Sequence, residues 1–355
     1  MHEEKWVMTI GGKAWRDLVI EEALDPDLAI VDAHHHVWDR SPIPGIEAYD
    51  REAFFADKTR SGHNIVATVS VDCRTNYRPD GPERFGILGE TDYIDAVAED
   101  ADRRGGRYAG ACAAIVPTAN LLEGAAVGEM LDAHLAISRR VRGIRLMTAF
   151  DDSLRAPPGG RPAGLMMRPD FREGFAELVK RGLSFDAWVF QTQIGEVVDL
   201  ARSFPAATII LDQLGGPFVG GRYADRAAES FAAWKTAIHA VAACENVVLK
   251  IGGLNMHYAG VSAIGREKPR NSQATAAAQK DYILTAIDAF GPSRCMFVSN
   301  FPVDMSAISY PVMWNTFKRV VAGFSEAERA DMFADVATRV YRIDARTAAP
   351  AAGPL

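Results

Sequence analysis

The amino-acid sequence predicts an α/β protein, a (β/α)8 TIM barrel with long loops after its strands. Short apolar runs alternate with helix-period segments between Ile30 and Val340, and no low-complexity linker separates them. The runs are continuous stretches rich in Val, Ile and Leu, which is typical of parallel strands buried on both faces. About eight such strand–helix units in one domain favour a barrel over the alternative, an open doubly wound sheet.

The predicted strands come in order along the chain, each as one short apolar run. They are residues 29–34, 65–71, 110–116, 143–147, 184–190, 208–211, 247–251 and 295–298. Amphipathic helices lie between them. In one, Phe231, Trp234, Ile238 and Val241 recur at steps of three and four, the spacing of one helix face.

Helix ends are marked by residues that stop a helix. These are Gly105, Gly182, Pro205 and Gly291. Near the end of the chain, Ser325 and Glu328 have the spacing of a capping box before a last apolar stripe. We therefore expect three parts: an N-terminal extension (1–28), one barrel domain (29–342) and a C-terminal tail (343–355).

Loop lengths differ between the two ends of the predicted strands. Segments that enter strands are short, as at 139–142, 181–183 and 205–207, whereas segments that leave them are long, as at 38–50, 72–90, 148–169 and 252–272. In a barrel the long loops all open on the C-terminal rim, where barrel enzymes build their sites. Functional residues are therefore expected just after each strand.

Composition narrows the class of partner. The chain has 355 residues, 48% hydrophobic and 24% charged, which is enough to bury a sizeable core. Its net charge of −7 argues against a nucleic-acid or anionic-membrane partner. Its four cysteines form no CxxC pair, and its N-terminus lacks the pattern of a signal peptide. We expect a cytoplasmic protein with no membrane span, acting on a small molecule.

The first predicted strand ends in three histidines. Because side chains alternate along a strand, His34 and His36 face one side and His35 the other. Two imidazoles on an inward face could bind a metal ion, bind an anion or move a proton. The alternative is a polar strand end that is hydrogen-bonded to the next loop.

This opening motif, Asp-Ala-His-His-His at 32–36, resembles that of amidohydrolase family 2, which includes lactonases, dicarboxylate lactone hydrolases and metal-dependent decarboxylases. Further matching stretches follow in order, one for each later strand: 141–145, 183–188, 211–217, 246–253 and 299–304. The resemblance covers most of the chain and implies a (β/α)8 barrel. It also implies a dimer.

Three positions depart from the family's metal-binding pattern. Metal-dependent relatives carry a histidine after the fifth strand, an Asp-His pair after the sixth and an aspartate after the eighth, and this chain has Gln191, Gln213 and Asn300 there. Amides are poor zinc ligands, and Asn300 cannot take a proton from water. We expect no cofactor. The alternative is zinc or another divalent ion held by His34 and His36 with Asp304.

Other rim residues are candidate substrate contacts. Arg145 on the fourth strand needs an anionic or carbonyl partner, either the substrate or a structural ion pair. Asp304 is the candidate base, with helix capping as its alternative, and His257 either reaches the site or is a solvated loop residue. Arg74 and Tyr77 lie in the second rim loop, and Lys250 lies on the seventh strand, where an inward lysine needs a partner. The expected apolar and aromatic wall comprises Trp38, Trp188, Phe301, Met256 and Tyr258.

Three functions remain open at this point. The first is a metal-independent hydrolase of a lactone, cyclic ester or amide, with His34, His36, Asn300 and Asp304 in catalysis and Arg145, Gln191 and Gln213 holding substrate. The second is a metal-free lyase, decarboxylase, dehydratase or isomerase acting on an aromatic or carboxylated small molecule. The third is a non-catalytic binding protein on a degenerate barrel.

Overall fold

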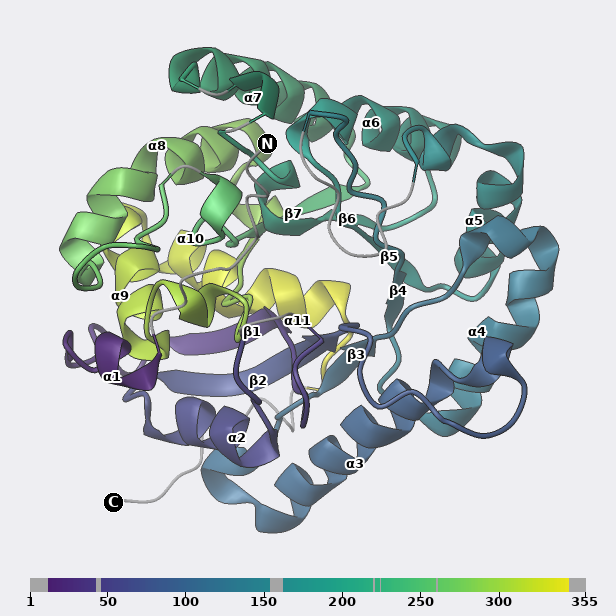
Figure 1. Ribbon diagram of the computed structural model, residues 1–355, viewed down its shortest axis with the longest axis horizontal. Helices are drawn as coiled ribbons and strands as arrows, with labels where there is room; N and C mark the ends of the chain where they lie inside the picture. The colour runs from purple at the N-terminus through teal and green to yellow at the C-terminus, as the bar shows by residue number, and fades with distance from the viewer. Residues whose placement is uncertain are drawn as a thin grey trace, which may run out of the picture.

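A computed structural model of the protein describes residues 12–42, 46–153, 162–219, 221–223, 225–259 and 261–344. Over these residues parallel strands and helices alternate around a ring, which is the predicted α/β barrel (Figure 1). The strands are β1 (Ala29–His35), β2 (Asn64–Val71), β3 (Ala114–Val116), β4 (Gly143–Arg145), β5 (Ser184–Ala187), β6 (Ile209–Leu211), β7 (Val247–Ile251) and β8 (Cys295–Phe297).

Most helices surround the strands on the outside of the ring, whereas the last one, α11 (Val336–Val340), packs against the inner apolar layer. The helices are α1 (Lys13–Arg16), α2 (Arg51–Arg60), α3 (Leu88–Arg104), α4 (Val127–Ile137), α5 (Pro169–Lys180), α6 (Ile194–Ser203), α7 (Ala227–Ala242), α8 (Ser272–Phe290), α9 (Tyr310–Val320), α10 (Glu326–Ala330) and α11. The capping box predicted from Ser325 and Glu328 is confirmed at α10. In the described part of the chain, none of these helices combines the length and apolarity needed to span a membrane.

The strands pair in chain order. β1, β2 and β3 form one sheet and β4 to β8 another, with every pairing parallel. Isolated bridges continue this order: Ile115 on β3 pairs with Val141, just before β4, and His35 on β1 pairs with Phe301, in the segment after β8. Because all pairings are parallel, the carboxyl ends of the strands meet at one rim.

The third predicted strand begins four residues too early. Gly110 and Cys112 have positive φ values of 77° and 51°, which are incompatible with an extended strand. The carbonyl of Gly110 instead accepts the amide of Thr68 at 2.9 Å, and regular pairing with β2 begins at Ala114. The predicted strands 143–147 and 184–190 also end early, at Arg145 and Ala187.

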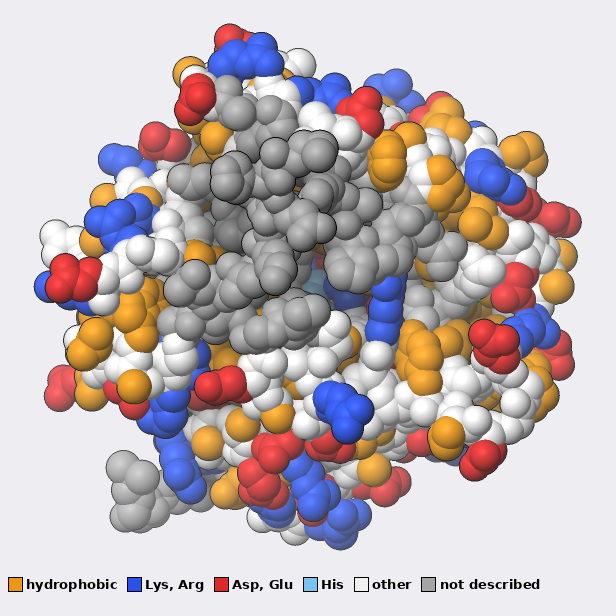
Figure 2. Space-filling view, in the orientation of Figure 1, with side chains coloured by type: hydrophobic (Ala, Val, Ile, Leu, Met, Phe, Trp, Pro, Cys, Tyr) orange, Lys and Arg blue, Asp and Glu red, His pale blue; other side chains and the backbone are white. Residues whose placement is uncertain are grey.

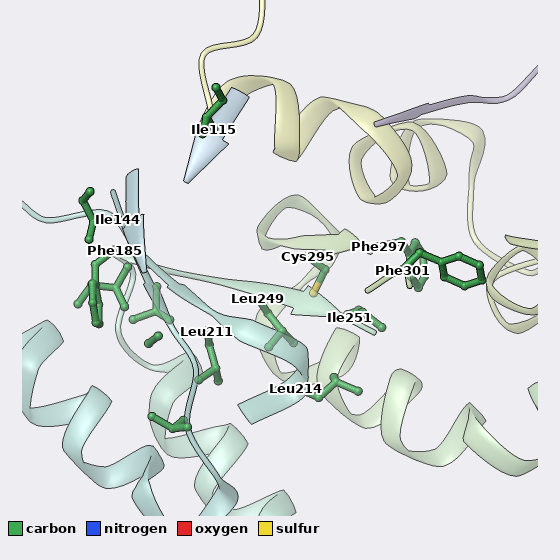
Figure 3. Packing of buried hydrophobic residues seen from close by; sticks show 14 of the residues in the cluster. Ile115, Ile144, Phe185, Leu211, Leu214, Leu249, Ile251, Cys295, Phe297 and Phe301 are labelled. Atoms are coloured by element: carbon green, nitrogen blue, oxygen red, sulfur yellow. The ribbon is translucent and has the colours of Figure 1, made fainter. Parts of the chain in front are cut away.

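Two apolar layers hold the barrel. The larger lies between the strands and the helices, and Figure 3 shows Phe185, Leu211 and Leu249 within it. The smaller lies inside the ring and includes Ile210 and Val248. Burial of such side chains stabilises the fold by about 25 cal/mol per Å² of apolar surface.

The C-terminal segment completes the inner layer. Val336 and Tyr341 share that layer with the strands, and α11 runs beside β1 in Figure 1. Arg339 donates to the carbonyl of Ser293, just before β8, and Arg342 to that of Gly182, just before β5. The segment therefore lies at the amino-terminal end of the barrel, opposite the rim of long loops.

Candidate active site

The three histidines at the end of β1 point as the alternation predicts. The rings of His34 and His36 meet edge to face, with centroids 5.0 Å apart. His35 faces away, stacked on Phe54, and its Nε2 lies 2.8 Å from the Thr68 hydroxyl. His34 and His36 thus belong to one site, while His35 belongs to the packing between β1 and α2.

The tautomer of His36 follows from its partner. Its Nδ1 lies 2.8 Å from the carbonyl oxygen of Val71, which can only accept, so Nδ1 carries the proton and Nε2 keeps its lone pair. Burial lowers the pKa of His36 well below its ordinary value, and the charge of Arg145 adds to this shift. His36 is therefore a neutral imidazole with a basic nitrogen at neutral pH.

His34 lies between two cations. Its Nδ1 is 3.3 Å from Lys250 Nζ and its Nε2 is 3.4 Å from Arg145 Nη1. The carboxylate of Asp212 lies 3.6 Å from Nδ1. Burial lowers the pKa of His34 to about 3, with Lys250 as the next contribution, so this ring is also uncharged at neutral pH.

Lys250 is paired, as an inward lysine on a strand should be. Its Nζ lies 2.5 Å from Asp186 Oδ2 on β5 and 3.2 Å from Asp212 Oδ1 after β6. The hydroxyl of Tyr341 donates to the same oxygen of Asp186 at 2.9 Å, and Lys250 Nζ lies 5.3 Å from the Tyr341 ring centroid. Burial opposes ionisation of Asp212, but Lys250 and His34 hold its pKa below the ordinary value.

Arg145 has both kinds of partner that its burial requires. Its Nη2 donates to the backbone oxygen of Asp72 and lies 3.7 Å from that residue's carboxylate, while Nη1 lies 3.9 Å from Asp212. A structural ion pair is therefore present. Asp72 also lines the neighbouring cavity, so its contact with Arg145 brings the guanidinium group close to that cavity.

That cavity has a volume of about 660 Å³ and lies among the rim loops after β2, β3 and β4. Its lining residues include Asp72, Arg74, Tyr77, Asn120, Leu146 and Met147. The predicted contacts Arg74 and Tyr77 thus share one cavity. Figure 2 shows a histidine side chain beside basic side chains at the centre of this face. A cavity of this size suits a small molecule.

A buried carboxyl pair stands at the edge of the cavity. Glu90 accepts the backbone amides of Cys73 at 2.7 Å and Arg74 at 3.1 Å, and it interacts with Asp72. Burial, together with the charge of Asp72, raises the pKa of Glu90 well above its ordinary value. The buried Glu90 carboxyl therefore releases its proton less readily than an exposed glutamate does.

The amides at two family positions touch each other. Gln213 Nε2 lies 2.5 Å from Asn300 Oδ1, and Asn300 Nδ2 donates to Asp304 Oδ1 at 2.9 Å. Gln213 and Asn300 have φ values of 49° and 53°, a left-handed conformation that is strained for residues with a Cβ and is concentrated at functional sites.

Asp304 lies behind Asn300. Its Oδ2 accepts from the side chain of Asn255 at 3.2 Å, and burial raises its pKa to about 7. The expectation that it caps the following helix is wrong, because α9 has Ser309 as its N-cap residue.

Gln191 lies apart from this amide chain. Its Nε2 donates to the hydroxyl of Ser230 at 3.0 Å, and its Oε1 accepts from the backbone of Phe218 at 3.2 Å. The side chain therefore connects the loop after β6 to α7. Its position after β5 does not bring it into the hydrogen-bonded group formed by His34, Arg145 and Lys250.

The predicted aromatic residues divide into different environments. Trp188 packs with Phe190, 5.9 Å between centroids, and with Tyr258, 6.4 Å, in a cluster at the rim. Trp38 is fully buried and stacks on His36 at 5.9 Å. Phe301 belongs to the large core, where it meets Tyr310 edge to face. The side chain of His257 lies outside the described residues.

The fold and these strand-end residues agree with one family. The amidohydrolase profile matches residues 31–343. The chain belongs to amidohydrolase family 2. Among relatives of this family, the uncharacterized protein y4mH of Sinorhizobium fredii is 32% identical over 333 residues, which cover 89% of this chain and 99% of that protein. The L-fucono-1,5-lactonase of Burkholderia multivorans is 31% identical over 175 residues, 49% of this chain and 56% of that enzyme.

Solved structures show the same fold. An amidohydrolase of Burkholderia multivorans with bound zinc has a TM-score of 0.68 at 24% identity, covering 89% of this chain and all (100%) of that one. A putative 2-pyrone-4,6-dicarboxylic acid hydrolase of Pseudomonas putida has a TM-score of 0.59 at 16% identity, with 89% and 98% covered. A 2,6-dihydroxybenzoate decarboxylase of Rhizobium has a TM-score of 0.53 at 13% identity, with 91% and 99% covered.

The metal that the family resemblance implies does not fit the residues of this amidohydrolase. Both ring nitrogens of His34 face cations, at 3.3 and 3.4 Å, and the ligand positions after β6 and β8 carry amides that bond to each other. As the side chains stand, no group of three or more His, Cys, Asp or Glu in the described ranges could hold a metal ion.

Three ionisable residues of the site were not predicted: Asp72, Asp186 and Asp212. Lys250 was singled out only as an inward lysine that needs a partner. Asp186 lies within a predicted strand, whereas Asp72 and Asp212 directly follow one. The signal that could have found them was a charged residue within or directly after an apolar strand, which requires a partner when it is buried.

Proposed function

We propose that this amidohydrolase hydrolyses a small cyclic ester, a lactone that carries an anionic group, without a metal ion. The observation that carries the proposal is the fixed tautomer of His36, whose Nδ1 is bound to Val71 O at 2.8 Å beside the buried Arg145. A neutral imidazole with one free lone pair is suited to take a proton from water.

The proposed reaction needs only water and the residues described. The water oxygen forms a bond to the lactone carbonyl carbon while its proton passes to His36 Nε2. Arg145 and His34 stabilise the negative charge that develops on the carbonyl oxygen. The ring C–O bond then breaks, and the proton moves from His36 to the departing alkoxide, which yields a hydroxy acid.

Substrate positioning is assigned to the cavity and the amide pair. Arg74 and Tyr77 line the cavity, and Arg145 lies 3.7 Å from Asp72, which also lines it. In this proposal the two arginines attract a carboxylate. Gln213 and Asn300 orient water or substrate. Asp304 orients Asn300, because its Oδ1 accepts that residue's amide at 2.9 Å.

The similarity to an L-fucono-1,5-lactonase supports lactone hydrolysis. Decarboxylases among the structural neighbours make a lyase the competing outcome. The test is to incubate the protein with five- and six-membered lactones, with and without a carboxylate, in oxygen-18 water. Hydrolysis places the label in the product acid, whereas an unlabelled product or released CO2 favours the lyase.

Variants connect the activity to the site. His36→Gln should lower kcat by about 10²–10⁴-fold, the usual contribution of a general base. The control is His239→Gln, because His239 is exposed on α7. If folded His36→Gln protein retains full turnover, the assignment of the base is wrong; if ligands stabilise the wild type but remain unchanged, the protein is a binding protein.

A further inference from the structure

The ammonium group of Lys250 stands where three potential metal ligands converge. His34 Nδ1, Asp186 Oδ2 and Asp212 Oδ1 lie 3.3, 2.5 and 3.2 Å from Lys250 Nζ. The four side chains come from β1, β5, β7 and the residue directly after β6, and all are fully buried. Strands on several sides of the barrel thus direct their polar groups at one nitrogen atom.

One imidazole and two carboxylates are donors that a divalent ion accepts, at about 2.0–2.2 Å in zinc sites. Here the distances are those of hydrogen bonds to an ammonium group. Spare binding capacity also remains, because Asp186 Oδ1 and Asp212 Oδ2 are buried without a hydrogen bond among the described residues. Buried carboxylate oxygens without donors are costly unless a cation lies near them.

The carboxylates of the cluster already have cationic partners. Lys250 Nζ lies 2.5 Å from Asp186 and 3.2 Å from Asp212, and Arg145 lies between Asp212 at 3.9 Å and Asp72 at 3.7 Å. A divalent ion held by His34, Asp186 and Asp212 would have to share their space with the Lys250 ammonium, which would repel it. Removing the lysine takes away one positive charge and leaves a space between the Asp186 and Asp212 carboxylates, which would attract a cation.

We infer that the Lys250 ammonium is a built-in cation that occupies the position at which His34, Asp186 and Asp212 would otherwise hold a divalent metal ion. The side chain of Lys250 thus supplies, through a covalent bond to the chain, the positive charge that a metal ion would supply there. Lys250 acts through the ring of His34 and is therefore a positioning residue. The inference rests on the metal independence in the proposed function. Its test measures metal binding, so a failure to hydrolyse lactones would not decide the inference.

The test is Lys250→Ala in the full chain, which removes the charge and makes space for an ion. After treatment with a chelator, zinc is titrated and measured by calorimetry and elemental analysis, and cobalt is used as a coloured probe of coordination. Lys250→Ala should bind about one equivalent of zinc at least about tenfold more tightly than the wild type does. Cobalt should give visible absorption bands in the variant only.

The matched control is Lys250→Ala with Asp186→Asn and Asp212→Asn, which should lose the gain in zinc affinity. If Lys250→Ala does not fold alone, it is expressed with zinc in the medium; folding that depends on zinc supports the inference, and failure to fold with zinc overturns it. The inference is also overturned if wild-type protein holds one zinc through His34, or if folded Lys250→Ala binds zinc no better than the wild type.

Discussion

The side-chain amide of Gln213 lies 2.5 Å from the side-chain oxygen of Asn300, so the residues at two altered family positions form one hydrogen-bonded pair. Asn300 also donates a hydrogen bond from its side-chain nitrogen to Asp304 Oδ1 at 2.9 Å. The amides are therefore parts of one network. A substitution of either amide should therefore alter the hydrogen bonds of the other amide and of Asp304.

Restoring the family's aspartate at position 300 should destabilise the protein. Asn300→Asp removes the donor to Asp304 and places two carboxylates in contact in a buried site. We expect a loss of about 1–3 kcal/mol in the free energy of unfolding at pH 7, where Asp304 is partly ionised, and a smaller loss at pH 5, where it is protonated. Denaturant unfolding at both pH values measures this; an equal loss at both would contradict it.

The stability contribution of Asp304 should depend on pH. Burial raises its pKa to about 7 from an ordinary 3.8, so the folded protein keeps a proton that the unfolded chain releases between these values. That contribution is full below pH about 4 and is lost as the pH rises to about 7. Relative to wild type, Asp304→Asn should gain as much as about 4 kcal/mol over this range.

The measurement is denaturant unfolding of both proteins from pH 4 to pH 7. Asp281→Asn is the control, because Asp281 is exposed on α8 and its replacement should leave the pH dependence unchanged. A constant difference between Asp304→Asn and the wild type over this range would show that Asp304 does not titrate there.

The stability contribution of His35 should depend on pH in the opposite direction to that of Asp304. Burial lowers its pKa to about 3 from 6.5, so the unfolded chain binds a proton that the folded protein excludes. The stability contributed by neutral His35 is present above pH about 6.5 and is lost as the pH falls toward 3. His35→Gln should therefore unfold less steeply with acid than the wild type, as measured by circular dichroism from pH 7 to pH 4. An unchanged acid slope would contradict the assigned burial effect.

Activity should persist at acid pH. Because burial lowers the pKa of His34 to about 3 and that of His36 well below 6.5, neither ring becomes protonated at mildly acidic pH. On a lactone substrate kcat/KM should not fall through pH 6.5, as it would for an unperturbed histidine base, but should fall only at a lower pH. A half-maximal rate near pH 6.5 in folded enzyme would assign the base elsewhere.

Arg145 should discriminate between anionic and neutral lactones. Arg145→Met removes a charged donor near the cavity, and hydrogen bonds to charged groups contribute about 1.5–3 kcal/mol. We expect kcat/KM to fall by about 10–100-fold more for a carboxylated lactone than for a neutral one of the same ring size. Melting temperatures serve as the folding control, because Asp72 and Asp212 lose a partner. Equal losses for both lactones would remove Arg145 from carboxylate recognition.

Much of the fold could be predicted because it depends on local patterns. The apolar runs place every described strand, and the capping box at Ser325 and the stop at Gly105 place helix ends. The errors lie where one residue's backbone overrides the pattern, as Cys112 does with its φ of 51° before β3. Periodicity cannot report such a conformation, since it measures side-chain polarity and not backbone angles.

For the site, the sequence by itself determined that His34 and His36 share a face, because alternation along a strand is a property of the backbone. It also determined that amides stand at the family's ligand positions. Only the tertiary structure decided that Gln191 bonds to Ser230, that Gln213 meets Asn300 and that Lys250 lies 2.5 Å from Asp186. Those pairings join residues 39, 87 and 64 positions apart in the chain, and their distances depend on how distant strands and helices pack around the barrel.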